Sequence, residues 1–177
     1  MSLDYNTACN AYENEDYKTA FELFFGLAKE GDVSSQMNIA NMLLHGLGIN
    51  KDEEKAYECY QQAADNEDSE AQYLYGWFCI KNTKEAEGLK YLNASCEANY
   101  EEAVYDLAGI YAHGMYGGEL DLDKACILYE KSIFMKQEDA INGLMYARSK
   151  RDGRFKTLIY FMKNISKFRK AVKTKEN

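Results

Sequence analysis

Apolar and small residues recur along the chain at helical spacing, and the pattern itself repeats with a period in the mid-thirties. In one set of segments, a small residue is followed four, five and eight positions later by residues that share one face of an α-helix. In a second set, the apolar positions fall three, four, seven and eight residues after a small residue. The first set starts at Ser35, Ala71, Ala103 and Ala140, and the second at Ala20, Ala56, Gly88, Ala125 and, less well matched, Leu158.

Ten helices follow from this pattern, and the punctuation of the chain agrees with them. We expect helices at residues 3–13, 16–30, 33–46, 52–66, 69–82, 84–98, 101–114, 121–136, 138–151 and 154–172. Side-chain acceptors stand at expected N-caps, and glycines stand where a left-handed residue ends a helix. The caps are Asp16, Asp52, Ser69, Asp121 or Asp123, and Asp152, and the glycines are Gly31, Gly46, Gly48 and Gly114.

A repeat of this length is one helix pair, which cannot bury its own apolar face and therefore stacks on its neighbours. The sequence predicts a single all-α domain over residues 1–177. Its units are expected at about 3–32, 33–68, 69–100, 101–137 and 138–172, followed by a tail at 173–177. The last helix is expected to cap the stack with its apolar side while its basic side faces water.

The motif in residues 35–64 resembles the Sel1-like repeat, a relative of the tetratricopeptide repeat. The resemblance rests on Gly46, Gly48, Asp52, the pair Lys55-Ala56, Tyr60, and the pair Ala63-Ala64. Residues 103–133 match with one extra loop residue, and residues 69–100 match in both helices but lack the glycine loop. The resemblance implies a right-handed α–α superhelix, or solenoid, of about five antiparallel helix pairs. It also implies an adaptor or scaffold that binds other proteins.

The tetratricopeptide relatives use the first helix of each pair to line a concave face. Carried onto this chain, positions two, six, nine and ten of each first helix become candidate partner-binding residues, and they include the only Trp and both His. Trp and Tyr anchor many interfaces. Tyr73 and Tyr105 have the alternative of packing against the next repeat, and Trp77 that of joining the core. The candidates chosen from these positions are Met37, Asn41, His45, Tyr73, Trp77, Lys81, Tyr105, His113, Asn142 and Tyr146.

Catalytic, metal and cofactor sites are not expected. His45 and His113 precede glycines at helix ends, where a histidine meets free carbonyls, and no further metal ligands stand at short spacing. The glycine-rich segment 114–118 follows no strand and lacks the Lys-Ser/Thr of a phosphate loop. No Ser, Cys or Lys stands in a nucleophile motif. The sequence therefore predicts a protein that is not an enzyme.

Charge is distributed unevenly along the chain. The formal net charge is −8, but residues 1–140 carry −17 and residues 141–177 carry +9. The acidic part suits a basic protein partner, while the basic end favours either a solvated cap, weak binding to an anionic surface, or docking on a second molecule. Five cysteines without a CxxC motif, no secretion signal and no apolar run of membrane-spanning length predict a cytoplasmic protein.

Two functions remain open from the sequence. The first is a non-enzymatic interaction module that binds one or more proteins on its concave face. The second is a dedicated inhibitor or immunity protein that neutralises a bacterial toxin or effector. Specific nucleic-acid binding is not expected, and the oligomeric state is not indicated.

Overall fold

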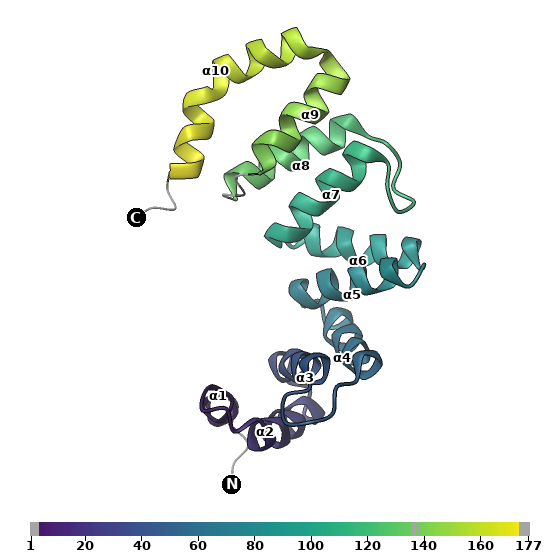
Figure 1. The fold of residues 1–177 in the computed structure, drawn as a ribbon, viewed down its shortest axis with the longest axis vertical. Coiled ribbons are helices and arrows are strands. Elements are labelled where there is room, and N and C mark those ends of the chain that lie inside the picture. Colours follow the sequence, from purple (N-terminus) through teal and green to yellow (C-terminus); the bar gives the residue numbers. More distant parts are fainter. Residues whose placement is uncertain (1–3, 136, 138, 174–177) are drawn as a thin grey trace. The chain divides into compact units, whose positions relative to one another are not determined.

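The computed structural model describes residues 4–135, 137 and 139–173, and within these residues it contains ten α-helices and no strands (Figure 1). The predicted helix starts at residues 3 and 138 and the predicted tail beyond Lys173 lie outside the described residues. The helices are α1 Tyr5–Glu13, α2 Tyr17–Lys29, α3 Val33–His45, α4 Glu53–Asp65, α5 Ser69–Lys81, α6 Glu85–Glu97, α7 Glu101–His113, α8 Leu122–Phe134, α9 Ala140–Asp152 and α10 Arg154–Lys173.

Neighbouring helices pack on one another, which confirms the all-α solenoid. Two compact units are formed, Met1–Phe78 and Cys79–Asn177, here called unit 1 and unit 2. In unit 1 the packed neighbours run from α1 to α4, and in unit 2 from α6 to α10, with α8 also touching α10 and α7 touching α9. Helix α5 contains the boundary between the units. That residues 1–177 act as a single domain stays a prediction.

Most of the predicted N-caps are confirmed by backbone hydrogen bonds to their side chains. The backbone N–H groups of Thr19, Lys55 and Lys124 donate to the carboxylates of Asp16, Asp52 and Asp121 over 3.3, 3.1 and 2.9 Å. These bonds satisfy amide groups that have no partner inside the helix. Each therefore fixes where the second helix of a pair begins.

Two predicted caps are wrong. Ser69 is the first residue of α5, and the cap is Asp68, which accepts a hydrogen bond from the Ala71 N–H at 2.8 Å. Asp152 is the last residue of α9 and caps no helix, because its carboxylate accepts hydrogen bonds from the Arg151 guanidinium at 2.8 and 2.9 Å. In both cases the sequence offered adjacent acceptors or a strong ion-pair partner, and spacing alone did not choose between them.

The same hydrogen bond closes four of the helix pairs, whatever the length of the loop between the helices. The N–H of the residue before the second helix donates to a carbonyl near the end of the first helix. The pairs are Asp16 to Ala11, Asp52 to Leu43, Lys84 to Cys79 and Asp121 to Tyr111, at 2.8–2.9 Å. The partners are five positions apart in sequence in two of these pairs, and nine or ten positions apart in the others. The longer loops leave the helices through Gly46 and Gly114, at φ of 72° and 62°.

The core follows the predicted register in the inner repeats. Small residues stand where helices approach closely, and they are fully buried. Ala20, Ala40 and Ala56 are 0 % exposed in unit 1, as are Ala103, Ala108, Ala125 and Ala140 in unit 2. Large side chains such as Phe24, Met42 and Leu107 fill the space between them. Close approach at an alanine and filling by a neighbour are one packing arrangement repeated along the chain.

The register predicts that Ala56 cannot be enlarged. Ala56→Leu should overpack the joint between α4 and its neighbours and lower the free energy of unfolding by about 1–3 kcal/mol. Glu58→Leu introduces the same side chain at an exposed position of the same helix and serves as the control. Urea denaturation of both variants measures the difference. Equal stability of Ala56→Leu and wild type would show that the register is wrong.

Two tyrosines occupy the same core position in two of the repeats. Tyr60 in α4 and Tyr129 in α8 stand four residues after the small residues Ala56 and Ala125, and they are 4 % and 5 % exposed. Burial raises the pKa of each phenol to about 12, with smaller contributions from neighbouring acidic groups. The folded chain therefore disfavours both tyrosinates.

This burial predicts a loss of stability at alkaline pH. Between about pH 10 and 12 the unfolded chain has released protons that the folded chain still holds, so the free energy of unfolding falls as pH rises, by up to about 2–3 kcal/mol per tyrosine. Chemical denaturation from pH 9 to 12 should show a shallower loss for Tyr60→Phe/Tyr129→Phe than for wild type. Tyr116→Phe, at an exposed position, should keep the wild-type slope. Identical slopes for all three proteins would contradict the burial argument.

Candidate partner-binding surfaces

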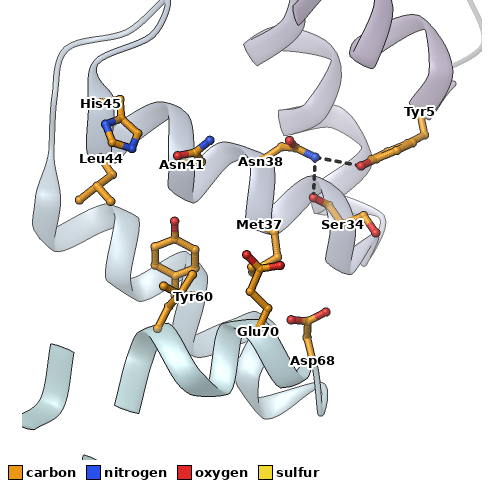
Figure 2. A pocket seen from close by; sticks show the side chains of 11 residues that line it. Tyr5, Ser34, Met37, Asn38, Asn41, Leu44, His45, Tyr60, Asp68 and Glu70 are labelled. Carbon is orange, nitrogen blue, oxygen red and sulfur yellow. Dashed lines mark hydrogen bonds between the residues drawn. The ribbon is translucent and has the colours of Figure 1, made fainter. Parts of the chain in front are cut away.

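A groove of about 510 Å³ lies in unit 1 along helix α3, and α1, α4 and α5 complete its walls (Figure 2). Its apolar part consists of Met37, Leu44 and Leu74, beside the nearly buried ring of Tyr60. The polar part follows one side of α3, because Ser34, Asn38, Asn41 and His45 recur at the three- and four-residue spacing that places them on one helix face.

Tyr5 and Asn38 fix the end of the groove nearest α1. The Asn38 amide donates to the Tyr5 hydroxyl at 3.0 Å and to the Ser34 carbonyl at 2.9 Å (Figure 2). Both amide hydrogens are engaged, so Asn38 can offer a partner only its carbonyl oxygen, which is an acceptor. Burial raises the pKa of Tyr5, and the hydrogen bond from Asn38 opposes part of that rise. The Tyr5 phenol is therefore neutral at physiological pH.

The side of the groove formed at the start of α5 is acidic. Asp68 and Glu70 line it, and Glu70 lies beside Met37 in Figure 2. One carboxylate oxygen of Asp68 is held by the Ala71 N–H. No Lys or Arg is found among the described residues that line this groove. Residues 1–78 contain four Lys and Arg against 15 Asp and Glu, so the surrounding field also attracts cations.

Unit 1 holds five of the ten predicted partner-binding residues, and three of them line the groove. Met37, Asn41 and His45 meet there as the register of α3 predicts. Tyr73 and Trp77 lie on α5, where both are partly buried, and the residues of α5 that line the groove are Glu70 and Leu74. Their part in binding stays a prediction.

Unit 2 holds the other five predicted residues, and they serve different contacts. Tyr105 packs edge-on against Tyr129, in the second helix of its own pair, with ring centroids 5.9 Å apart. His113 stacks on Tyr146 at 4.7 Å. Lys81 and Asn142 are exposed. Tyr146 also lines a second groove, of about 440 Å³, between α9 and α10.

Sequence reasoning missed several residues of the first groove. Ser34 and Asn38 carry a detectable signal, since they continue the polar stripe of Asn41 and His45 on α3. Tyr5 carries none, because it reaches the groove from a helix 33 residues away in sequence. The other missed residues, Tyr60, Asp68, Glu70 and Leu74, come from helices whose crossing with α3 is set by packing.

The groups of the groove provide hydrogen-bond acceptors, negative charge and apolar surface. Within the described part of the chain, no three His, Cys, Asp or Glu side chains gather as metal ligands. Among the same residues, no helix is both long and apolar enough to cross a bilayer. The acceptors, negative charge and apolar surface of the groove suit the binding of another molecule by surface contact.

Comparison with solved structures finds repeat proteins of the same fold. A Sel1 repeat protein from Oxalobacter formigenes superposes with a TM-score of 0.78 at 18 % identity, over 93 % of this chain and 70 % of that one. The protective antigen c5321 of uropathogenic Escherichia coli, described as displaying an SLR fold, gives 0.68 at 24 %, over 88 % of this chain and 35 % of that one. The protein MamA gives 0.60 at 22 %, over 94 % and 96 %.

A comparison with curated proteins finds no match. The family model of the Sel1 repeat, by contrast, matches three successive segments, residues 33–68, 69–100 and 101–133, which together exceed half of the chain. These segments coincide with the pairs α3–α4, α5–α6 and α7–α8. The fold of such repeats is typically a non-catalytic interaction scaffold. The chain belongs to the Sel1 repeat family, whose proteins generally mediate protein–protein interaction.

Proposed function

We propose that this protein is an interaction module that binds a basic segment of a partner protein in the groove of unit 1. The observation that carries the proposal is the make-up of that groove. Apolar residues of α3 and α5, amide side chains of α3 and two carboxylates line one hollow without any Lys or Arg among the described lining residues. This combination matches the chemistry of a lysine or arginine side chain, whose apolar stem and charged tip need different surroundings.

Binding would use the apolar, acidic and amide side chains of the groove differently. Met37, Leu44 and Leu74 offer apolar surface to aliphatic carbons of the partner. Asp68 and Glu70 offer charge-assisted hydrogen bonds to its ammonium or guanidinium group. The carbonyl oxygen of Asn38 accepts from a backbone N–H or a side-chain donor. The acidic surroundings speed encounter with such a partner, and the effect weakens as salt rises.

Trp77 and Tyr73 extend the proposed binding surface along α5. Both are partly buried, so each retains exposed atoms. An indole that keeps exposed surface beside an apolar wall gains contact area when a partner covers it. We therefore assign Trp77 to the binding surface as an anchor.

A general adaptor and a dedicated inhibitor would use the same groove with different selectivity. An inhibitor would bind one target tightly and stoichiometrically, whereas an adaptor would accept several partners more weakly. The groove favours the adaptor, because the partner chemistry it calls for is one basic residue beside apolar carbons, which many proteins offer.

Peptide selection tests the groove. From a phage-displayed random peptide library, the wild-type protein should enrich sequences with Lys or Arg next to an apolar residue. Asp68→Asn/Glu70→Gln removes both carboxylates, while the asparagine introduced in place of Asp68 retains the capping function. This double variant should bind the selected peptides about tenfold more weakly. Glu22→Gln/Glu58→Gln makes the same change of charge at exposed positions outside the groove.

The control variant separates the site from the field of the whole unit. It should bind the selected peptides within about threefold of wild type. Enrichment of acidic peptides, or equal losses in both double variants, would exclude the groove as the recognition site. A single natural partner bound far more tightly than any selected peptide would favour the inhibitor.

Fluorescence of the only tryptophan tests the anchor. Because Trp77 is partly exposed, acrylamide should quench its emission in the free protein. A saturating selected peptide should reduce the quenching and shift the emission to shorter wavelength. A blue-shifted emission that resists acrylamide in the free protein would place the indole in the core and remove Trp77 from the binding surface.

A further inference from the structure

The pair α9–α10 presents an apolar hollow. Met145, Tyr146 and Ser149 of α9 face Thr157, Leu158 and Phe161 of α10 across the groove of about 440 Å³, and Arg154 stands at its edge. The apolar surface continues along α10 through Met162 and Ile165, which lie four and seven residues after Leu158 and so share its face. Met145, Leu158, Met162 and Ile165 are 46 %, 58 %, 68 % and 49 % exposed.

The preceding repeat shows what normally covers these positions. Thr157 is the fourth residue of α10 and is 5 % exposed, so Thr157, and not the predicted Leu158, occupies the position of Ala125 in α8. The equivalents of Met145, Leu158, Phe161 and Ile165 are therefore Ala108, Cys126, Tyr129 and Ile133. Each of these is at most 5 % exposed. Helix α9 packs against both α7 and α8 there, and the Tyr129 ring lies directly against Gly143 of α9. In this repeat architecture, the equivalent surface thus packs against one further helix.

Helix α10 is packed against the rest of the repeat on one side, although its other face is exposed. The packed side lies against α8 and α9. The Tyr160 hydroxyl donates to Glu130 of α8 at 2.7 Å, and the guanidinium of Arg148 of α9 lies 3.4 Å from the Tyr160 ring centroid. Phe168 on that side is 4 % exposed. The predicted apolar cap therefore describes the Tyr160 side, while the Leu158 side exposes the large residues that a cap would lack.

We propose that the α9–α10 groove binds an amphipathic helix of a partner protein whose flanks are acidic. A helical ligand follows from the repeat geometry, because the equivalent surface of the preceding repeat packs against a helix. The apolar face follows from the exposed Leu158, Met162 and Ile165 and from Met145 across the groove. Recognition would be of the helix-in-groove type.

The acidic flanks follow from charge. Residues 140–173 contain ten Lys and Arg and one acidic residue, Asp152. Asp152 is paired with Arg151 at 2.8 Å and with Arg148 at 3.4 Å. Arg154 borders the groove, and the Lys150 ammonium lies 5.8 Å from the Tyr146 ring centroid. A helix with basic flanks would be repelled at this surface, and one with acidic flanks attracted.

The shape of the surface favours a helix over a lipid bilayer. Apolar side chains stand on two facing walls, and a convex ridge of side chains reaches both, whereas a flat membrane surface reaches only the rims. The site is independent of the groove in unit 1, which has the opposite charge. Failure of one therefore leaves the other standing.

Two synthetic helical peptides with the same leucine stripe test the inference, one with Glu on the flanks and one with Lys. Fluorescence anisotropy of the labelled peptides with the full chain should show binding of the Glu peptide only, weakening as salt is raised. Leu158→Gln should reduce the affinity about tenfold, because Leu158 lines the groove and is 58 % exposed. Ile127→Gln is the control, because Ile127 is 67 % exposed on α8 and does not line the groove.

Several results would overturn the inference. These are no binding of the Glu peptide up to about 1 mM, equal binding of the Lys peptide, or equal losses in the two glutamine variants. Sedimentation of phosphatidylserine vesicles with the wild-type chain but not with Leu158→Gln would identify a membrane surface instead. Self-association abolished by Leu158→Gln in analytical ultracentrifugation, without peptide binding, would identify a second copy of this chain.

Discussion

Close approach of helices at small side chains is the constraint on which the rest of this structure depends. Ala20, Ala56, Ala108 and Ala125 have no exposed surface, so a neighbouring helix meets each of them at contact distance. A single pair cannot bury these positions by itself, and it gains stability only from the pair beside it. The core is therefore shared out along the chain.

This arrangement also determines what is left for partners. Side chains that face the neighbouring helix are committed to packing, and the others can vary freely in chemistry. Along α3 that freedom has produced amides and a histidine beside the acidic start of α5. At α9–α10 the packing face itself is open, and it carries large apolar residues within a basic surrounding. One architecture thus presents two surfaces of opposite charge.

The sequence predicted the fold closely because its signals are local and repeated. Helix spacing, capping aspartates and left-handed glycines all report on residues within a few positions of one another. The family match to residues 33–133 rests on the same signals. The misplaced caps at Ser69 and Asp152 show the limit of such signals, since Asp68 and Arg151 decided the outcome through contacts that spacing does not encode.

The candidate sites were less predictable for a physical reason. Met37, Asn41 and His45 were found because they share one helix face, whereas Tyr5, Asp68 and Leu74 join them only through the crossing of separate helices. The exposure of Met145 and Leu158 escaped prediction for the opposite reason. They correspond to the buried Ala108 and Cys126 of the preceding repeat, but no described helix covers them.

The hydrogen bond that closes four of the helix pairs has a consequence for how such a chain can change. The N–H of Asp52 donates to the Leu43 carbonyl, and the N–H of Asp121 donates to the Tyr111 carbonyl. Each bond holds the two ends of a loop together, whatever residues lie between them. The short connection between Cys79 and Lys84 closes over the same bond. Insertions between the two anchoring residues should leave the helices in place, so these loops are natural points for grafting a new recognition segment onto the scaffold.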